Sequence, residues 1–107
     1  MAVQGKVVVV GCGKIGSAIV KLLHGSGRYQ LKVIEQHRPL LDAIATLDGI
    51  ETDSFAVHDE ARMIEAIRGW NAVVSACSFD VNPLIARACS AAGCSYFDLT
   101  EDVETTR

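Results

Sequence analysis

The sequence contains little of what membrane, secreted and nucleic-acid-binding proteins carry. Its 107 residues have a net charge of −3, and no cluster of basic residues offers a surface for nucleic acid. No apolar run approaches the roughly 20 residues that cross a bilayer, and the N-terminus lacks the charged-then-apolar order of a signal peptide. Aromatic residues make up only 6% of the chain, so we expect an aliphatic core. These absences indicate that residues 1–107 form one compact, cytoplasmic domain, which contacts neither membrane nor nucleic acid.

Metal-binding patterns are missing as well. No two cysteines have the two-residue spacing of a metal knuckle, and no histidine forms an i, i+4 pair or stands beside a cysteine. Without a secretion signal, the cysteines are expected to be free thiols. The residues in question are Cys12, Cys77, Cys89 and Cys94, and His24, His37 and His58. We therefore expect no metal ion.

What the chain does contain is a regular alternation of two patterns. Short β-branched runs predict strands at residues 6–10, 29–34, 50–57, 72–77 and 95–99. Helical spacing predicts helices between them, two of which begin at Pro39 and after His58 or Asp59, and residues 101–107 resemble the start of another. The most regular helical faces are Ile15, Ala18, Ile19 and Leu22, and then Val81, Leu84, Ile85, Ala88, Cys89 and Ala92. This alternation predicts an α/β fold, a doubly wound parallel sheet of order 3-2-1-4-5 in a three-layer αβα arrangement.

A glycine pattern stands between the first strand and the first helix. Gly11-Cys12-Gly13-Lys14-Ile15-Gly16 has the form G-x-G-x-x-G, which after a strand and before a helix is typical of dinucleotide binding. Glycine at these places permits a sharp turn, a close approach of the pyrophosphate and tight packing of the helix. The free N–H groups of the first helical turn then point at the phosphates. A tight turn without a ligand is the alternative.

An acid follows the second predicted strand. Glu35 stands where a carboxylate accepts hydrogen bonds from the adenosine ribose, and Gln36 belongs to the same predicted site. A negative charge there repels a 2′-phosphate, so the sequence favours NAD. Arg38 can stack on adenine or pair with a 2′-phosphate, which leaves NADP possible.

The fourth predicted strand ends in small residues. Ser75-Ala76-Cys77-Ser78 lies at the carboxyl edge of the sheet, where the ligand crevice of this topology opens. We expect Ala76, Cys77 and Ser78 to let the nicotinamide half of the cofactor pass close to the backbone. Cys77 has no histidine near it in the sequence, so a wall residue is favoured over a nucleophile.

Three segments together resemble the N-terminal cofactor domain of the saccharopine dehydrogenase family. They are "VVVVGCGKIGSAIVKLL", "NPLIARAC" and "YFDLTEDVETTR". The resemblance implies a Rossmann domain that carries NAD or NADP, followed by a second domain for an amino-acid substrate. Thr100 and Glu101 match the loop that faces the family's active-site cleft. Ala56 and Val57 stand where many members have an acid and a valine, which implies an apolar or backbone contact with adenine.

The family carries out hydride transfer at the C–N bond of an amino acid in lysine metabolism. The resemblance implies that this chain is a fragment of such an oxidoreductase, one that binds the cofactor without turnover and possesses no assigned catalytic residue. A homo-oligomer is compatible with it. The alternative is a nucleotide-sensing domain of a potassium channel or transporter, whose loop after strand 4 the segment "SFDVN" resembles. A domain that serves only as an oligomerisation scaffold is the third possibility.

Overall fold

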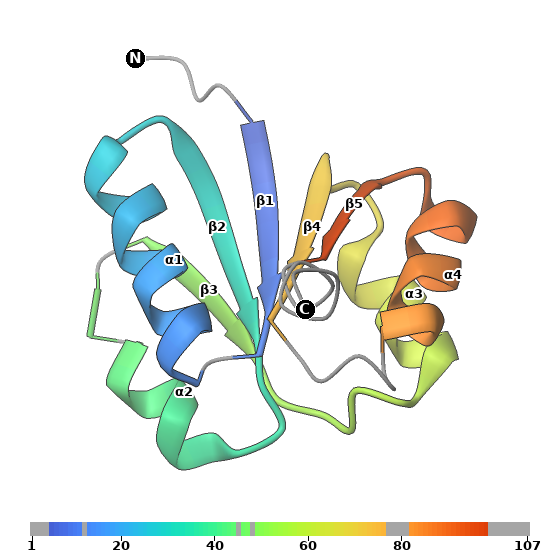
Figure 1. Ribbon diagram of the computed structural model, residues 1–107, viewed down its shortest axis with the longest axis horizontal. Helices are drawn as coiled ribbons and strands as arrows, with labels where there is room; N and C mark the ends of the chain where they lie inside the picture. Colours follow the sequence, from blue (N-terminus) through green and yellow to red (C-terminus); the bar gives the residue numbers. More distant parts are fainter. Residues whose placement is uncertain (1–4, 12, 45, 48, 77–81, 99–107) are drawn as a thin grey trace, which may run out of the picture.

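The computed structural model describes residues 5–11, 13–44, 46–47, 49–76 and 82–98. Five parallel strands form one sheet in the order β3-β2-β1-β4-β5 (Figure 1), which confirms the predicted doubly wound topology. The strands are β1 (Gly5–Val10), β2 (Tyr29–Ile34), β3 (Ile50–Asp53), β4 (Ala72–Ser75) and β5 (Ser95–Asp98). The helices are α1 (Lys14–Ser26), α2 (Arg38–Ile44), α3 (Glu60–Ile67) and α4 (Asn82–Ala92). Within these described ranges, no helix has the length and apolar character that spanning a membrane requires.

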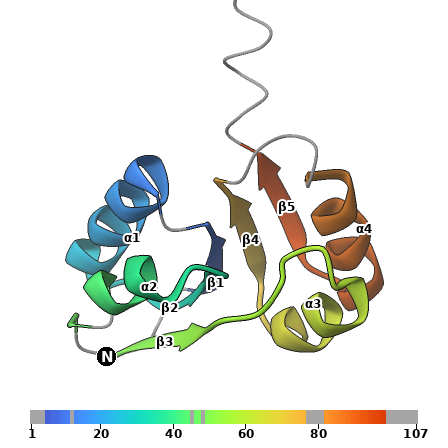
Figure 2. The same cartoon turned by 90° about the horizontal axis from the view of Figure 1, so that it is seen from below.

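The sheet separates two layers of helices. Figure 2 shows α1 and α2 on one face and α3 and α4 on the other. The valines of β1 alternate between the two layers: Val7 and Val9 pack with the α1 and α2 side, whereas Val8 and Val10 pack with the α3 and α4 side. A run of β-branched residues is therefore needed here, because the central strand is covered on both faces.

The central position of β1 determines where a ligand can reach the sheet. Val10 pairs with Ile34 of β2 on one side and with Ser75 of β4 on the other. The chain leaves β1 toward α1 and leaves β4 toward the opposite helix layer, so the connections diverge at this edge. A crevice at such a switch point is where ligands of open α/β sheets bind.

Helix α1 is confirmed, but a different face of it is buried. Of the apolar residues that predicted it, Ile19 packs against the core, whereas Ile15 is 59% exposed and Leu22 73% exposed. The sheet is contacted instead by Gly16 and Val20, both buried. The rotation of α1 is set by Gly16, which lies against the preceding turn, and apolar spacing alone does not reveal this constraint.

The other predicted boundaries differ by a few residues. β3 ends at Asp53 and not at 57, because the chain turns there toward α3, and β4 ends at Ser75. Asp59 is the N-cap of α3, and its Oδ1 accepts the Arg62 N–H at 3.2 Å, which confirms one of the two predicted caps. Val81 and residues 99–107 of the predicted elements lie outside the described residues.

A tryptophan closes the α3 side of the core near the amino ends of the strands. Trp70 is only 8% exposed. The Nζ atoms of Lys6 and Lys32 lie 5.0 and 5.9 Å from the centre of its ring system. Lys32 Nζ also donates to the Ala66 carbonyl oxygen at 2.9 Å, near the C-terminus of α3. Two strand lysines thus make cation–π contacts with the indole.

The rotation of α1 predicts unequal losses of stability for two truncations in the same helix. Val20→Ala removes two methyl groups from a fully buried site and is expected to lower the free energy of unfolding by about 2 kcal/mol. Leu22→Ala changes an exposed site and is expected to stay within about 0.5 kcal/mol of the wild type. Denaturant unfolding followed by circular dichroism measures both, and a larger loss for Leu22→Ala would contradict the observed rotation.

Candidate functional site

The chain turns sharply where it leaves β1. Gly11 is buried and has a φ of 95°, a region that residues with a side chain rarely adopt. Its N–H donates to the Ile34 carbonyl oxygen at 2.8 Å, which continues the ladder to β2 by one residue. The turn is therefore fastened to the sheet on its ligand-facing edge.

Helix α1 rests directly on this turn. A Cβ atom built at Gly16 would overlap the carbonyl oxygen of Gly11 and would lie 3.6 Å from the Ala76 Cβ. The overlapping partner is backbone that is already bonded to β2, so it cannot move aside as a flexible side chain would. The absence of a side chain at Gly16 brings the first turn of α1 against both β1 and the end of β4, as the sequence predicted.

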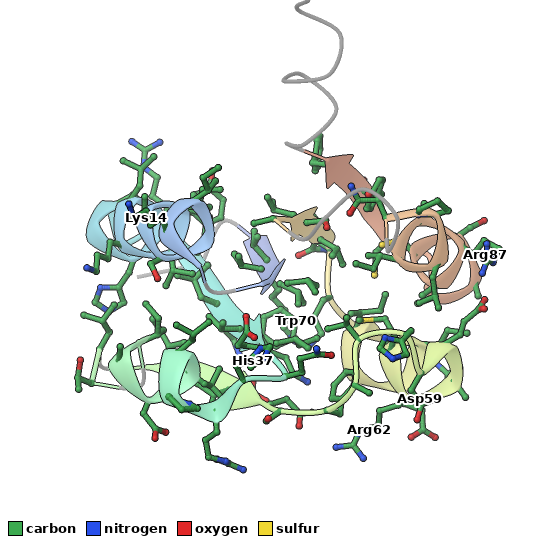
Figure 3. All side chains as sticks on the ribbon, turned by 60° about the horizontal axis from the view of Figure 1, so that its bottom comes forward. Lys14, His37, Asp59, Arg62, Trp70 and Arg87 are labelled. Atoms are coloured by element: carbon green, nitrogen blue, oxygen red, sulfur yellow. The ribbon has the colours of Figure 1, made fainter. Side chains whose placement is uncertain are left out.

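The N-terminus of α1 is left open for an anion. Gly13 is the N-cap, with no side-chain hydrogen bond to the helix, and the first turn contains no acid. The first helical bond runs from the Ser17 N–H to the Gly13 carbonyl oxygen at 2.8 Å, so the amides before it have no acceptor inside the helix. No described atom lies within 4 Å of a Cβ built at Gly13, and Lys14 and Ile15 are exposed (Figure 3). Free amides and the helix dipole therefore favour negative charge beside Gly13.

The turn after β2 is organised by Glu35. Its side chain is only 8% exposed, and its backbone N–H donates to the Asp53 carbonyl oxygen at 3.1 Å. Its Oε2 atom accepts the backbone N–H of His37 at 2.9 Å and lies 3.2 Å from His37 Nδ1. The sequence analysis identified Glu35 as a site residue but assigned His37 no role in the site. A side chain with a hydrogen-bond donor two residues after an acid is the sequence signal for such a bond.

Two predicted segments of the adenosine site lie next to each other. The Gln36 side-chain oxygen accepts the Val57 N–H at 3.2 Å, which joins the turn after β2 to the loop between β3 and α3. Val57 is 7% exposed and belongs to the core on the α3 side, whereas Ala56 is exposed. Arg38 begins α2 and is exposed at the same edge.

The end of β4 lies beside the glycine turn. The Ala76 N–H donates to the Val10 carbonyl oxygen at 2.9 Å, which places Ala76 beside the glycine turn. The buried hydroxyl of Ser75 donates to Asn82 Oδ1 at 2.6 Å, so the first residue of α4 is bound to the strand end. The sequence analysis assigned Asn82 no role in the site. The predicted site residues Cys12, Cys77, Ser78 and Thr100, together with Glu101, lie outside the described residues.

Neither a metal centre nor a reactive thiol is present in the part of the chain that the structure describes. No group of three or more His, Cys, Asp or Glu residues there is arranged to hold a metal. Cys89 and Cys94 are free, and Cys94 Sγ lies 3.3 Å from the Ile67 carbonyl oxygen and 3.2 Å from that of Trp70. Burial, with a smaller effect of Cys94, raises the pKa of Cys89 to about 11, and burial also raises the pKa of Cys94. Protonated thiols are poor nucleophiles, so both are structural residues.

The fold and the glycine turn define a dinucleotide-binding domain of the Rossmann type, and the comparisons agree. The chain belongs to the family described as the saccharopine dehydrogenase NADP binding domain, whose model matches residues 7–106. A comparison with curated proteins finds no match.

Solved structures share the fold at low sequence identity. Apo saccharopine dehydrogenase (L-Glu forming) from Saccharomyces cerevisiae superposes with a TM-score of 0.80 at 15% identity, over 88% of this chain and 21% of that chain. Vestitone reductase from alfalfa (Medicago sativa) gives a TM-score of 0.72 at 19% identity, over 89% of this chain and 36% of that chain. This chain thus spans about a fifth and about a third of the lengths of these two chains.

The contact at Gly16 predicts that this glycine is needed for folding. Gly16→Ala is expected to lower the free energy of unfolding by about 2 kcal/mol, because its Cβ displaces the bonded backbone of Gly11. Gly25→Ala in the same helix meets no neighbouring atom and is expected to raise it by about 0.5–1 kcal/mol. Scanning calorimetry of the two variants measures the difference, and equal stabilities would contradict the contact.

The raised pKa of Cys89 predicts a loss of stability in alkali. The folded state favours the protonated thiol, whereas the unfolded chain loses that proton near the ordinary pKa of 9.0. The contribution is therefore complete below pH 9 and declines as the pH rises toward about 11. Urea unfolding between neutral pH and pH 10.5 is expected to show a steeper decline for the wild type than for Cys89→Ala. Identical slopes would exclude the effect.

Proposed function

We propose that this chain is the cofactor-binding domain of a saccharopine dehydrogenase-like, NAD(P)-dependent oxidoreductase that acts on the C–N bond of an amino acid. The observation that carries the proposal is the packing of Gly16 on the Gly11 carbonyl, beside an N-terminus of α1 that has neither a side-chain cap nor an acid. This combination leaves open space next to Gly13, and backbone amides face that space. A side chain at residue 13 would occupy the place of the pyrophosphate.

The proposed cofactor lies across the carboxyl edge of the sheet. The pyrophosphate accepts hydrogen bonds from the amides of the first turn of α1, and Lys14 is exposed beside them. The adenosine ribose lies at the turn of Glu35, and adenine lies between Gln36 and the Ala56–Val57 segment. The nicotinamide half passes Ala76, with Cys12, Cys77, Ser78 and Thr100 as further predicted lining residues. When bound, the cofactor supplies or accepts the hydride.

The residues of this chain bind and orient the cofactor in this proposal. The Gly11 turn positions the diphosphate, and the bond between Gln36 and Val57 fixes the two loops around adenine. The amino-acid substrate, a second domain that holds it and the catalytic acid or base remain predictions from the family resemblance. Membership of the family over residues 7–106 supports the oxidoreductase over the nucleotide-sensing alternative.

The proposal predicts that a substitution at Gly13 lowers the affinity for the dinucleotide but changes the stability of the fold little. Its φ of −73° suits any residue, and no atom of the described residues lies within 4 Å of a Cβ built there, so Gly13→Ala is expected to cost less than about 1 kcal/mol of stability. The same methyl group would occupy the place of the pyrophosphate, so affinity is expected to fall about tenfold or more. Calorimetric titration with NAD, NADH, NADP and NADPH measures the affinities, and Gly25→Ala is the control.

Two results would overturn the proposed function. The first is that none of the four dinucleotides binds to the folded wild-type chain. The second is that Gly13→Ala leaves every affinity unchanged. The chain by itself is also expected to show no turnover of saccharopine or lysine, so measurable dehydrogenase activity would contradict the assignment as a cofactor domain alone.

A further inference from the structure

The acid that the sequence assigns to the adenosine ribose is already engaged by its neighbour. To exclude a 2′-phosphate, a carboxylate must present uncompensated negative charge to the crevice. The Glu35 side chain is only 8% exposed, and Oε2 accepts the His37 backbone N–H at 2.9 Å. The same oxygen lies 3.2 Å from His37 Nδ1. Glu35 therefore shares its charge with a donor ring at the surface.

His37 is oriented so that one ring nitrogen remains for a ligand. Its side chain is 69% exposed. An ionised carboxylate can only accept, so the pair with Glu35 assigns the hydrogen to Nδ1. Nε2 stands on the other side of the ring and carries a lone pair in the neutral form and an N–H in the imidazolium. The imidazolium can therefore donate outward while it keeps its bond to Glu35.

A positively charged residue follows this ring in the chain. Arg38 comes directly after His37 and is exposed. Lys14 begins α1 at the same edge of the sheet, and Figure 3 shows it apart from His37. A guanidinium binds phosphate through two parallel N–H groups, so Arg38 supplies a second donor set beside the imidazole.

Two carboxylates of the neighbouring elements are paired. Asp53 Oδ1 at the end of β3 lies 3.3 Å from Arg62 Nη2 and also accepts the Ser54 N–H. Asp59 accepts the Arg62 N–H as the cap of α3. His58, the remaining titratable group of that loop, is exposed, as are Asp42 of α2 and Glu51 of β3. Asp53 and Asp59 therefore oppose an anion near His37 less than unpaired carboxylates would.

Resting on the dinucleotide site proposed above, we propose that His37 is a specificity-determining residue that binds the 2′-phosphate of NADP through Nε2. Arg38 is the second donor, and Glu35 holds the ring in place from behind. This assignment reverses the preference that the sequence alone suggests for Glu35, because the acid supports a phosphate-binding ring and does not face the phosphate. NADP is therefore bound more tightly than NAD.

The geometry also couples this binding to a proton. Since Nδ1 is committed to Glu35, Nε2 donates to the phosphate only in the imidazolium form. The binding of NADP to a neutral imidazole therefore takes up a proton at this nitrogen. NAD has no 2′-phosphate and takes up none there.

The experiment compares two substitutions of His37 by calorimetric titration of the whole chain. His37→Ala removes both ring nitrogens. His37→Asn keeps a side-chain N–H for Glu35 in the place of Nδ1 but has no group in the place of Nε2. The ligands are NADP, NAD, 2′,5′-ADP and 5′-AMP, each in two buffers that differ in ionisation enthalpy. His24→Gln, at the opposite end of α1, is the control.

We expect both His37 variants to bind NADP and 2′,5′-ADP about tenfold more weakly, with NAD and 5′-AMP changed less than about twofold. Proton uptake with NADP is expected in the wild type and absent in His37→Asn. A wild type that prefers NAD, variants that leave the ratio of the two affinities unchanged, or proton uptake that persists in His37→Asn would each overturn the inference. The absence of binding of any dinucleotide would overturn the proposed function itself.

Discussion

The site depends on one contact between backbone atoms. The first turn of α1 can lie against β1 only because Gly16 presents a hydrogen to the Gly11 carbonyl. That contact sets the height and the rotation of the helix, and through them the direction of its free amides. It also selects which apolar residues of α1 are buried, so Val20 enters the core and Leu22 faces outward. The packing of the domain and its capacity for an anion therefore have the same origin.

Polar side chains perform the corresponding task at the other end of the crevice. Glu35 fixes the turn after β2 through His37, and Gln36 joins that turn to Val57. Ser75 and Asn82 make a buried bond that holds the start of α4 to β4. The Gln36–Val57 bond connects two βα loops, whereas the other two bonds each hold a single loop in its conformation. The loops are thus ordered by a few side chains, whereas the strands are ordered by the sheet.

The sequence predicted the fold in most respects because its signals are local. Four valines, a glycine turn and the spacing of apolar residues each specify one element, and right-handed crossovers then leave few topologies. The burial of Ile15 and the length of β3 were predicted less well, since both depend on contacts between elements. The pairing of Glu35 with His37 was not predicted, because its only signal in the sequence is a donor two residues after an acid and the bond also depends on which way the chain turns after β2.

The lone tryptophan offers a consequence of a different kind. Trp70 lies near the ammonium groups of Lys6 and Lys32 at the amino half of the sheet, away from the glycine turn. Its fluorescence therefore reports whether α3 and the first two strands remain together, and it is not contacted by a ligand at the opposite edge. A reduced nicotinamide absorbs in the range of indole emission. The efficiency of energy transfer from Trp70 therefore measures the distance between this tryptophan and the nicotinamide of a bound cofactor.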